Sequence, residues 1–358
     1  MTERFRLATS GARAVESFDL DGFSYLAIPQ LALDAPGTPA GMNGGDSDTD
    51  LLLLRREDVG DGEYAEYQRI PAPGGEDAEF FTIKGRAYLA VASIRSGHGP
   101  YEYETDSFVH RWNGEAFEPF QLFPGFAAKQ WRHFVIGDRH FLALAQGVAL
   151  PHLQERNRPS VIFEWSGGRF VPFQEIPSAW AYNWHHFTAG GAHYLAHADH
   201  VRPAVLYRWD GEGFVRHQEL VESGSRAFAT FSASGQLFLA CAVLDADSRL
   251  LRWEGDHFEP HQVLTGTGAR EFAVVEHEGS THLVRVNFIR GSREEPVTAL
   301  ESQVYRWDGD QLVEIGRFPT AGGTDVTVVE RDGEQLLIVS NSLTPDARFR
   351  TDSCAYSW

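Results

Sequence analysis

The sequence repeats a step of eleven residues between two apolar positions, and this step occurs seven times along the chain. In every copy a further step of eight residues leads to a leucine. The apolar positions that begin the seven copies are Leu7, Ile70, Phe123, Ile176, Leu220, Leu264 and Phe318. The leucines are Leu26, Leu89, Leu142, Leu195, Leu239, Leu283 and Leu337. A period of roughly 45 to 55 residues predicts one supersecondary unit used repeatedly, in which each copy buries its face against the next.

The third copy shows most clearly what one unit contains. Residues 131–136 and 141–145 are two short apolar and aromatic runs around a turn with Gly137, which predicts a β-hairpin. After a loop come two further runs, residues 161–165 and 170–174, separated by a glycine-containing turn. Each unit is therefore expected to hold four β-strands.

Seven such units predict an all-β fold, namely a seven-bladed β-propeller of four-stranded antiparallel blades. We interpret residues 1–358 as a single domain because the repeats use the whole chain. The seventh unit reaches Trp358 where its outermost strand should begin, and residues 4–7 align with an outer-strand segment, residues 120–123. The N-terminal strand is thus expected to complete the seventh blade, which leaves no long sheet edge exposed.

Several segments resemble the epilepsy-associated repeat, also called EAR or EPTP, namely residues 120–123, 131–136, 141–145 and 305–309. The resemblance extends over nearly the whole chain. It implies a seven-bladed propeller, used mainly as an extracellular recognition module, with a cation near its axis. The first unit departs from the pattern, since Arg55 and Arg56 replace its tryptophan corner. The N-terminal residues lack the apolar core of a signal peptide, so we expect a cytoplasmic location.

Charge limits the possible partners. The chain has 31 basic and 50 acidic residues, and its formal net charge is −19. This charge would be repelled by nucleic acid and by anionic membranes, so a protein or a small molecule is the expected partner. Cys241 and Cys354 are too few for a disulfide framework or a structural zinc site, and no organic cofactor is indicated.

Differences in length between the units fall between the second and third strands, so the long loops are expected on one rim of the propeller. Loops on a rigid scaffold commonly carry binding groups, although these could also be tolerated insertions. In the first loop, Asp46, Asp48 and Asp50 have the spacing of oxygen ligands for Ca²⁺ or Mg²⁺. The alternative is an ordinary solvated acidic loop.

A second candidate site is a ring of residues at the entry to the innermost strands. Its members are Ala14, Asp77, Gln130, Asn183, Ala227, Glu271 and Asp325. Symmetry should gather them at the channel mouth, where the three carboxylates would bind a cation or raise one another's pKa. The alternative is that each carboxylate caps a neighbouring backbone turn.

A third candidate is a group of imidazoles and aromatic rings. Trp180, Tyr182 and His200 are its members at the channel mouth, and the others are His98, Tyr101, Tyr103, His152 and His197. Such side chains can supply acid–base chemistry or hold an apolar or cationic ligand. His185 and His186 lie within a predicted strand, where packing is the expected role.

Two functions are consistent with these features. The first is a non-catalytic module that binds a ligand or a protein through the rim with the long loops. The alternative is a lyase or cyclase of specialised metabolism, with its pocket at the channel mouth. In that enzyme Mg²⁺ on Asp46, Asp48 and Asp50 would engage a diphosphate, while Trp180 and Tyr182 would face a carbocation. The sequence has no phosphate-binding Gly-Lys-Ser loop, nucleophile elbow or His-Glu-x-x-His motif.

Overall fold

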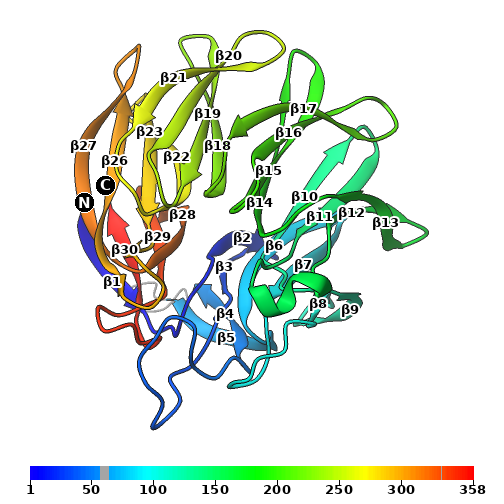
Figure 1. The fold of residues 1–358 in the computed structure, drawn as a ribbon, viewed down its shortest axis with the longest axis vertical. Coiled ribbons are helices and arrows are strands. Elements are labelled where there is room, and N and C mark those ends of the chain that lie inside the picture. Colours follow the sequence, from blue (N-terminus) through cyan, green and yellow to red (C-terminus); the bar gives the residue numbers. More distant parts are fainter. Residues whose placement is uncertain (57–63, 332) are drawn as a thin grey trace.

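Seven four-stranded antiparallel sheets stand around a central axis in the computed structural model (Figure 1), which describes residues 1–56, 64–331 and 333–358. In the first six sheets the four strands follow one another in chain order outward from the axis. This arrangement confirms the predicted seven-bladed propeller. The predicted hairpin of the third unit is also confirmed, since its strands pair from Gln130 with Ala145 to Ile136 with Arg139.

The strands of the first three blades are β2 (Glu16–Leu20), β3 (Phe23–Ile28), β4 (Asp50–Arg56), β5 (Tyr64–Pro71), β6 (Gly75–Ile83), β7 (Arg86–Ser93), β8 (Asp106–Trp112), β9 (Phe117–Pro124), β10 (Gln130–Ile136), β11 (Arg139–Ala145), β12 (Ser160–Ser166) and β13 (Arg169–Ile176). Those of the next three are β14 (Ala181–Ala189), β15 (Ala192–Asp199), β16 (Ala204–Trp209), β17 (Phe214–Val221), β18 (Ser225–Ala233), β19 (Gln236–Val243), β20 (Ser248–Trp253), β21 (Phe258–Leu264), β22 (Ala269–His277), β23 (Ser280–Asn287), β26 (Ala299–Trp307) and β27 (Leu312–Ala321).

The seventh blade joins the two ends of the chain. Its strands, from the axis outward, are β28 (Gly323–Arg331), β29 (Glu334–Asn341), β30 (Ser353–Ser357) and β1 (Thr2–Leu7). The termini consequently lie side by side at the edge of Figure 1. Closure by the N-terminal strand is therefore confirmed.

The hydrophobic core is divided among the contacts between neighbouring blades. One cluster, for example, combines Phe134 and Phe141 of the third blade with Trp184 and Phe214 of the fourth. His186 also belongs to this contact, because its ring stacks on that of Phe134 with centroids 4.7 Å apart. Each blade thus needs the next one to cover its face.

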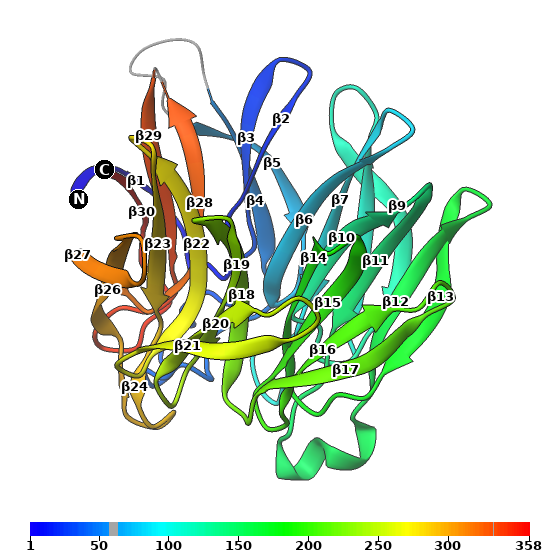
Figure 2. The same ribbon diagram turned by 90° about the horizontal axis from the view of Figure 1, so that it is seen from above.

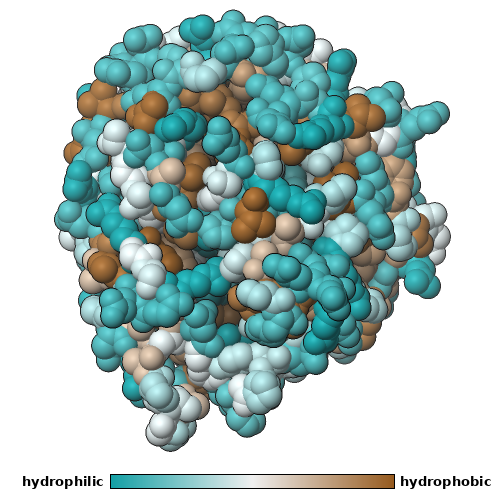
Figure 3. All heavy atoms as spheres, in the orientation of Figure 1, coloured by the Kyte–Doolittle hydropathy of each residue, from teal (hydrophilic) through white to brown (hydrophobic). Residues whose placement is uncertain are grey.

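The long loops project from one rim, the lower side of Figure 2, whereas the short hairpins form the opposite rim. The long-loop rim carries the 3-10 helix η1 (Pro151–Arg156) and a small hairpin of β24 (Arg290–Gly291) and β25 (Pro296–Val297). Hydrophobic residues on the face seen in Figure 3 lie in small, separate groups among hydrophilic ones. In the described residues, no helix has both the length and the apolar character needed to span a bilayer.

Strand β1 should contribute strongly to stability. Leu7 is buried at 5% exposure in a cluster with Ile338 and Ala355 of the seventh blade. The change Leu7→Ala should lower the free energy of unfolding by about 2 to 5 kcal/mol, and deletion of residues 1–9 should lower it further. Chemical denaturation measures both. Arg4→Ala is the control on the same strand, because its ion pair with Glu334 is exposed and should contribute under about 1 kcal/mol. A truncated chain as stable as the full one would contradict this role of β1.

Candidate functional site

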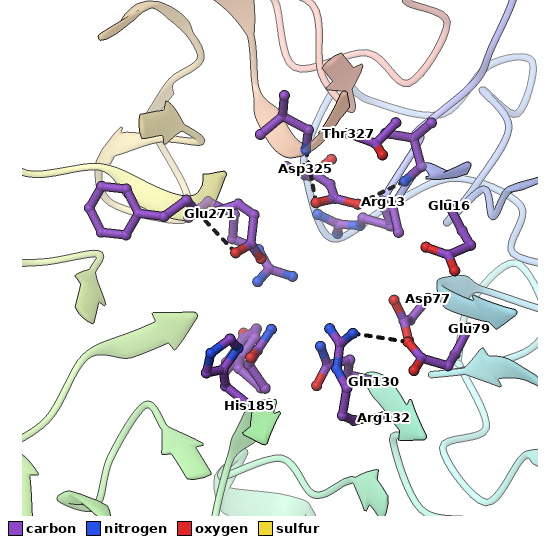
Figure 4. A pocket seen from close by; sticks show the side chains of 18 of the residues that line it. Arg13, Glu16, Asp77, Glu79, Gln130, Arg132, His185, Glu271, Asp325 and Thr327 are labelled. Atoms are coloured by element: carbon purple, nitrogen blue, oxygen red, sulfur yellow. Dashed lines mark hydrogen bonds and ion pairs between the residues drawn. The ribbon is translucent and has the colours of Figure 1, made fainter. Parts of the chain in front are cut away.

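The inner strands enclose a cavity of about 340 Å³ on the axis, called here the channel cavity (Figure 4). Of the predicted ring, the residues that line it are Ala14, Asp77, Gln130, Asn183, Glu271 and Asp325. They come from five different inner strands and the segment before β2. The structure therefore brings the three ring carboxylates into one cavity, inside the channel.

Several polar members of this ring hold neighbouring blades together. Asp77 Oδ2 accepts a hydrogen bond from the backbone N–H of Trp131 at 2.8 Å, one blade further on. Asp325 Oδ2 accepts one from Val15 N–H, also at 2.8 Å, across the closure of the ring. The amide oxygen of Gln130 likewise accepts a hydrogen bond from the backbone N–H of Trp184 in the next blade. These bonds support the alternative in which the ring carboxylates cap backbone groups, while cation binding by them stays a prediction.

Burial favours the protonated form of these carboxylates. It raises the pKa of Asp77 to about 8, with a further contribution from the nearby charge of Glu79. Burial, followed by the charge of Asp325, likewise raises the pKa of Glu271 to about 8. Deeper in the channel, Glu79 lies 3.2 Å from the guanidinium of Arg132. Burial raises the pKa of Glu79 as well, although the charge of Arg132 opposes this shift, so the channel carboxyls take up protons more readily than exposed ones.

A second ring lies one residue earlier in the sequence, and of its members only Tyr182 was predicted. In five blades the register of the innermost hairpin shifts here, for example between Gly75 and Asp77. Such a β-bulge leaves one extra residue unpaired and re-aims its side chain. The residues at this position, called here the bulge ring, are Arg13, Glu76, Lys129, Tyr182, Arg226, Arg270 and Thr324.

Five residues of the bulge ring line both the channel cavity and a second cavity of about 370 Å³, called here the mouth cavity. The predicted residues Trp180, Tyr182 and His200 all line the mouth cavity, and Tyr103 does as well. Its charged groups are mostly basic, whereas in the channel cavity carboxylates outnumber the basic side chains. The bulge ring thus separates two chemically different compartments.

The aromatic rings of the mouth cavity are covered by cations. The guanidinium carbon of Arg226 lies 3.7 Å from the centroid of Tyr182, and that of Arg293 lies 4.2 Å from the centroid of Trp180. Burial favours the neutral phenol, but the charges of Arg226 and Lys129 outweigh it and lower the pKa of Tyr182 to about 8. Burial also lowers the pKa of Lys129 to about 8. Both groups could therefore exchange protons near neutral pH.

The predicted metal ligands are only partly brought together. Asp46 and Asp48 lie with His98, so that one potential ligand atom from each is within 4.8 Å of the others. Asp50 begins strand β4 instead, where its carboxylate is 4.0 Å from Arg69. Asp50 pairs with Pro71 in the sheet, so its side chain lies apart from those of Asp46 and Asp48 in the loop.

The remaining predicted residues are dispersed. Tyr101 donates a hydrogen bond to Gly45 O at 2.7 Å, which ties the second loop to the first. His152 is exposed in η1, and His197 is buried with its ring centroid 4.1 Å from that of Trp184. His185 lines the channel and lies 2.9 Å from the Thr230 hydroxyl. These histidines do not form one catalytic group.

The raised pKa values lead to a pH prediction. A carboxyl whose pKa is higher in the folded chain than in the unfolded chain contributes its full stability only below the unfolded pKa of about 4. This contribution is lost as the pH rises through the folded pKa, which is about 8 for both residues. Asp77→Asn and Glu271→Gln should therefore gain melting temperature relative to the natural chain between pH 5 and 9. The amide of Gln130 shows that the site tolerates this acceptor. Glu175→Gln, at an exposed position, is the control. A difference independent of pH would contradict the raised values.

Comparisons with known proteins agree with the repeat assignment. The EPTP domain model matches residues 116–166, 169–210 and 213–254. The human "Thrombospondin-type laminin G domain and EAR repeat-containing protein" is 40% identical over 96 residues, which are 26% of this chain and 14% of that protein. "Leucine-rich repeat LGI family member 3" from Macaca fascicularis is 31% identical over 103 residues, which are 26% of this chain and 17% of that protein. The chain therefore matches only a small part of these longer relatives.

Among solved structures, "Crystal structure of BBS1N in complex with ARL6DN, soaked with mercury" superposes with a TM-score of 0.58 at 12% identity. The match covers 100% of this chain and 96% of that one, and at this identity it supports the fold alone. The similarity to the EPTP domain therefore rests on the sequence matches and not on this superposition. This chain is a seven-bladed β-propeller in which residues 116–166, 169–210 and 213–254 match the EPTP domain, and parts of it are similar to the human and macaque proteins.

Proposed function

We propose that this propeller is a recognition module that binds its ligand in the mouth cavity, on the rim with the long loops. The observation that carries the proposal is the cavity itself, which is lined from six of the seven blades and is about 370 Å³ in volume. Pockets of roughly 300 to 1,000 Å³ with apolar walls and a few polar groups are typical of small-molecule sites. The human relative is named for its EAR repeats, and the resemblance of this chain to that repeat favours a recognition module.

The loops that build the cavity are held in place by buried hydrogen bonds. Arg95 is only 5% exposed, and its guanidinium donates to Asn43 O at 3.0 Å, Gly44 O at 2.6 Å and Ser47 Oγ at 2.9 Å. These bonds fix the first long loop against the second blade. A binding site formed by such loops would be largely preformed, which reduces the entropy lost on binding.

The enzyme alternative receives less support. A lyase or cyclase that stabilises a carbocation would need accessible faces on Trp180 and Tyr182. Guanidinium groups already lie over both rings and would repel a second cation. We therefore favour recognition over cyclisation.

The proposed site can be tested by blocking it. Asn43 is exposed and lines the mouth cavity, so Asn43→Trp should fill the opening without disturbing the core. In a thermal-shift screen of a metabolite library, compounds that stabilise the natural chain should fail to stabilise this variant. Asp138→Trp, in a hairpin turn on the opposite rim, is the matched control. Equal stabilisation of all three proteins would place the ligand elsewhere and reject the proposal.

Binding of Ca²⁺ or Mg²⁺ stays a prediction for the first loop, with His98 beside Asp46 and Asp48. A cation that binds only the folded chain would raise its melting temperature. We expect such a rise on adding millimolar Ca²⁺ or Mg²⁺ after EDTA treatment, and its loss in Asp46→Asn combined with Asp48→Asn. Identical melts of the natural chain with EDTA and with either ion would count against this site.

A further inference from the structure

The mouth cavity contains a buried cation, Arg226, whose hydrogen-bonding capacity is only partly used. Arg226 is 3% exposed, and its Nε and Nη1 atoms have no hydrogen-bond partner among the described residues. Lys129 is also 3% exposed, but its ammonium donates to Gly147 O at 2.8 Å and to Ala127 O at 3.1 Å. Arg226 therefore differs from its neighbour in having buried donors without a partner among the described residues.

The charges around Arg226 are unbalanced. The bulge ring holds four basic residues and a single carboxylate, Glu76, which lies 3.4 Å from Arg13 and 3.9 Å from Arg270. Burying cations without an equal number of anions is costly, because the lost hydration is not replaced. An anion at Arg226 would offset this cost and would accept hydrogen bonds from its unpartnered N–H groups.

Two further carboxylates, those of Asp245 and Glu294, line the outer part of the cavity. The side chain of Asp245 is 65% exposed, and Glu294 is exposed as well. Water screens exposed charges much more than buried ones. These carboxylates therefore weaken the positive field at Arg226 only modestly.

The walls beside the cations are apolar. They come from long loops of several blades, and their members include Leu31, Met42, Ile94, Val148, Leu244 and Phe288. An inorganic anion would leave this apolar lining without a partner, whereas an organic one would cover it and gain hydrophobic stabilisation. The apolar lining therefore favours a ligand that carries an apolar body beside its anionic group.

We infer that the mouth cavity binds an organic anion. Its carboxylate or phosphate group lies against Arg226, and its apolar body lies against the loop walls. This inference rests on the proposed function and names the chemical class of its ligand. Guanidinium groups bind carboxylates and phosphates through paired hydrogen bonds, so both groups suit Arg226.

Matched pairs of probes test the charge requirement. Benzoate and phenyl phosphate have the same apolar ring as neutral benzyl alcohol, and isothermal titration calorimetry with the full chain at pH 7 measures all three. We expect at least one anion to bind more tightly than benzyl alcohol. The comparison between benzoate and phenyl phosphate then distinguishes a carboxylate ligand from a phosphate one.

Variants test the role of Arg226. In Arg226→Met the affinity for the anion should fall roughly tenfold to a hundredfold, as expected for losing hydrogen bonds to a charged group. Arg226→Lys, which keeps the charge but not the paired donors, should lose less. Arg252→Met removes the same charge from an exposed position of the same blade and should leave the affinity unchanged. Melting curves of each variant confirm that it is folded.

The inference is overturned if neither anion binds at millimolar concentration, if benzyl alcohol binds as tightly, or if Arg226→Met and Arg226→Lys both retain full affinity. The Asn43→Trp variant separates this failure from failure of the proposed site. A neutral ligand that is blocked by Asn43→Trp would keep the recognition site while rejecting the anion. Anion binding unaffected by Asn43→Trp would instead locate an anion site outside the mouth cavity and reject both.

Discussion

The β-bulge at the start of the inner strands determines what this propeller can present on its axis. A regular strand points alternate side chains to opposite faces, so consecutive residues cannot both face the channel. The bulge inserts one unpaired residue, and this allows both Glu76 and Asp77 to line the channel cavity. Repeated around the ring, the same distortion produces two adjacent layers of side chains with different chemistry.

The two layers have different tasks. The layer that contains Asp77 and Asp325 stabilises the ring of blades. These two carboxylates accept hydrogen bonds from the backbone N–H groups of Trp131 and Val15 in neighbouring blades. In the bulge ring Thr324 and Glu76 also join blades, through Ala12 O and the guanidinium of Arg13. The other members form no hydrogen bond to the backbone of a neighbouring blade in the described residues, and a bulged residue has left the regular hydrogen-bonding pattern of its strand. Most positions of the bulge ring can therefore vary in chemistry without loosening the blades. This separation explains how a repeated fold can carry an irregular site in which Arg226, Lys129 and Tyr182 occupy equivalent positions.

The fold was predictable from the sequence because it depends on spacing that each repeat preserves. Leu89, Leu142 and Leu195 are all fully buried at equivalent places, and the missing outer strand at Trp358 indicated where residues 2–7 would pair.

The candidate site was predicted less completely. Trp180, Tyr182 and His200 do line one cavity, but the ring chosen at the entry to the inner strands was Asp77 and its equivalents rather than the residues before them. A bulge changes which side chains face the axis and leaves no reliable mark in residue spacing. The basic residues Arg13, Lys129, Arg226 and Arg270, recurring at one position of the repeat, were the available signal.

Net charge is a poor guide to the ligand of such a protein. The formal charge of −19 is spread mainly over exposed positions, where water and salt screen it within roughly 10 Å. Arg226 and Lys129 are each 3% exposed, so their fields act with less screening over the short distances inside the mouth cavity. The acidic surface would repel large polyanions such as nucleic acids, which must approach it over a wide area. A small organic anion would meet mainly the cations of the cavity. The same charge distribution can therefore exclude one class of anion and admit another.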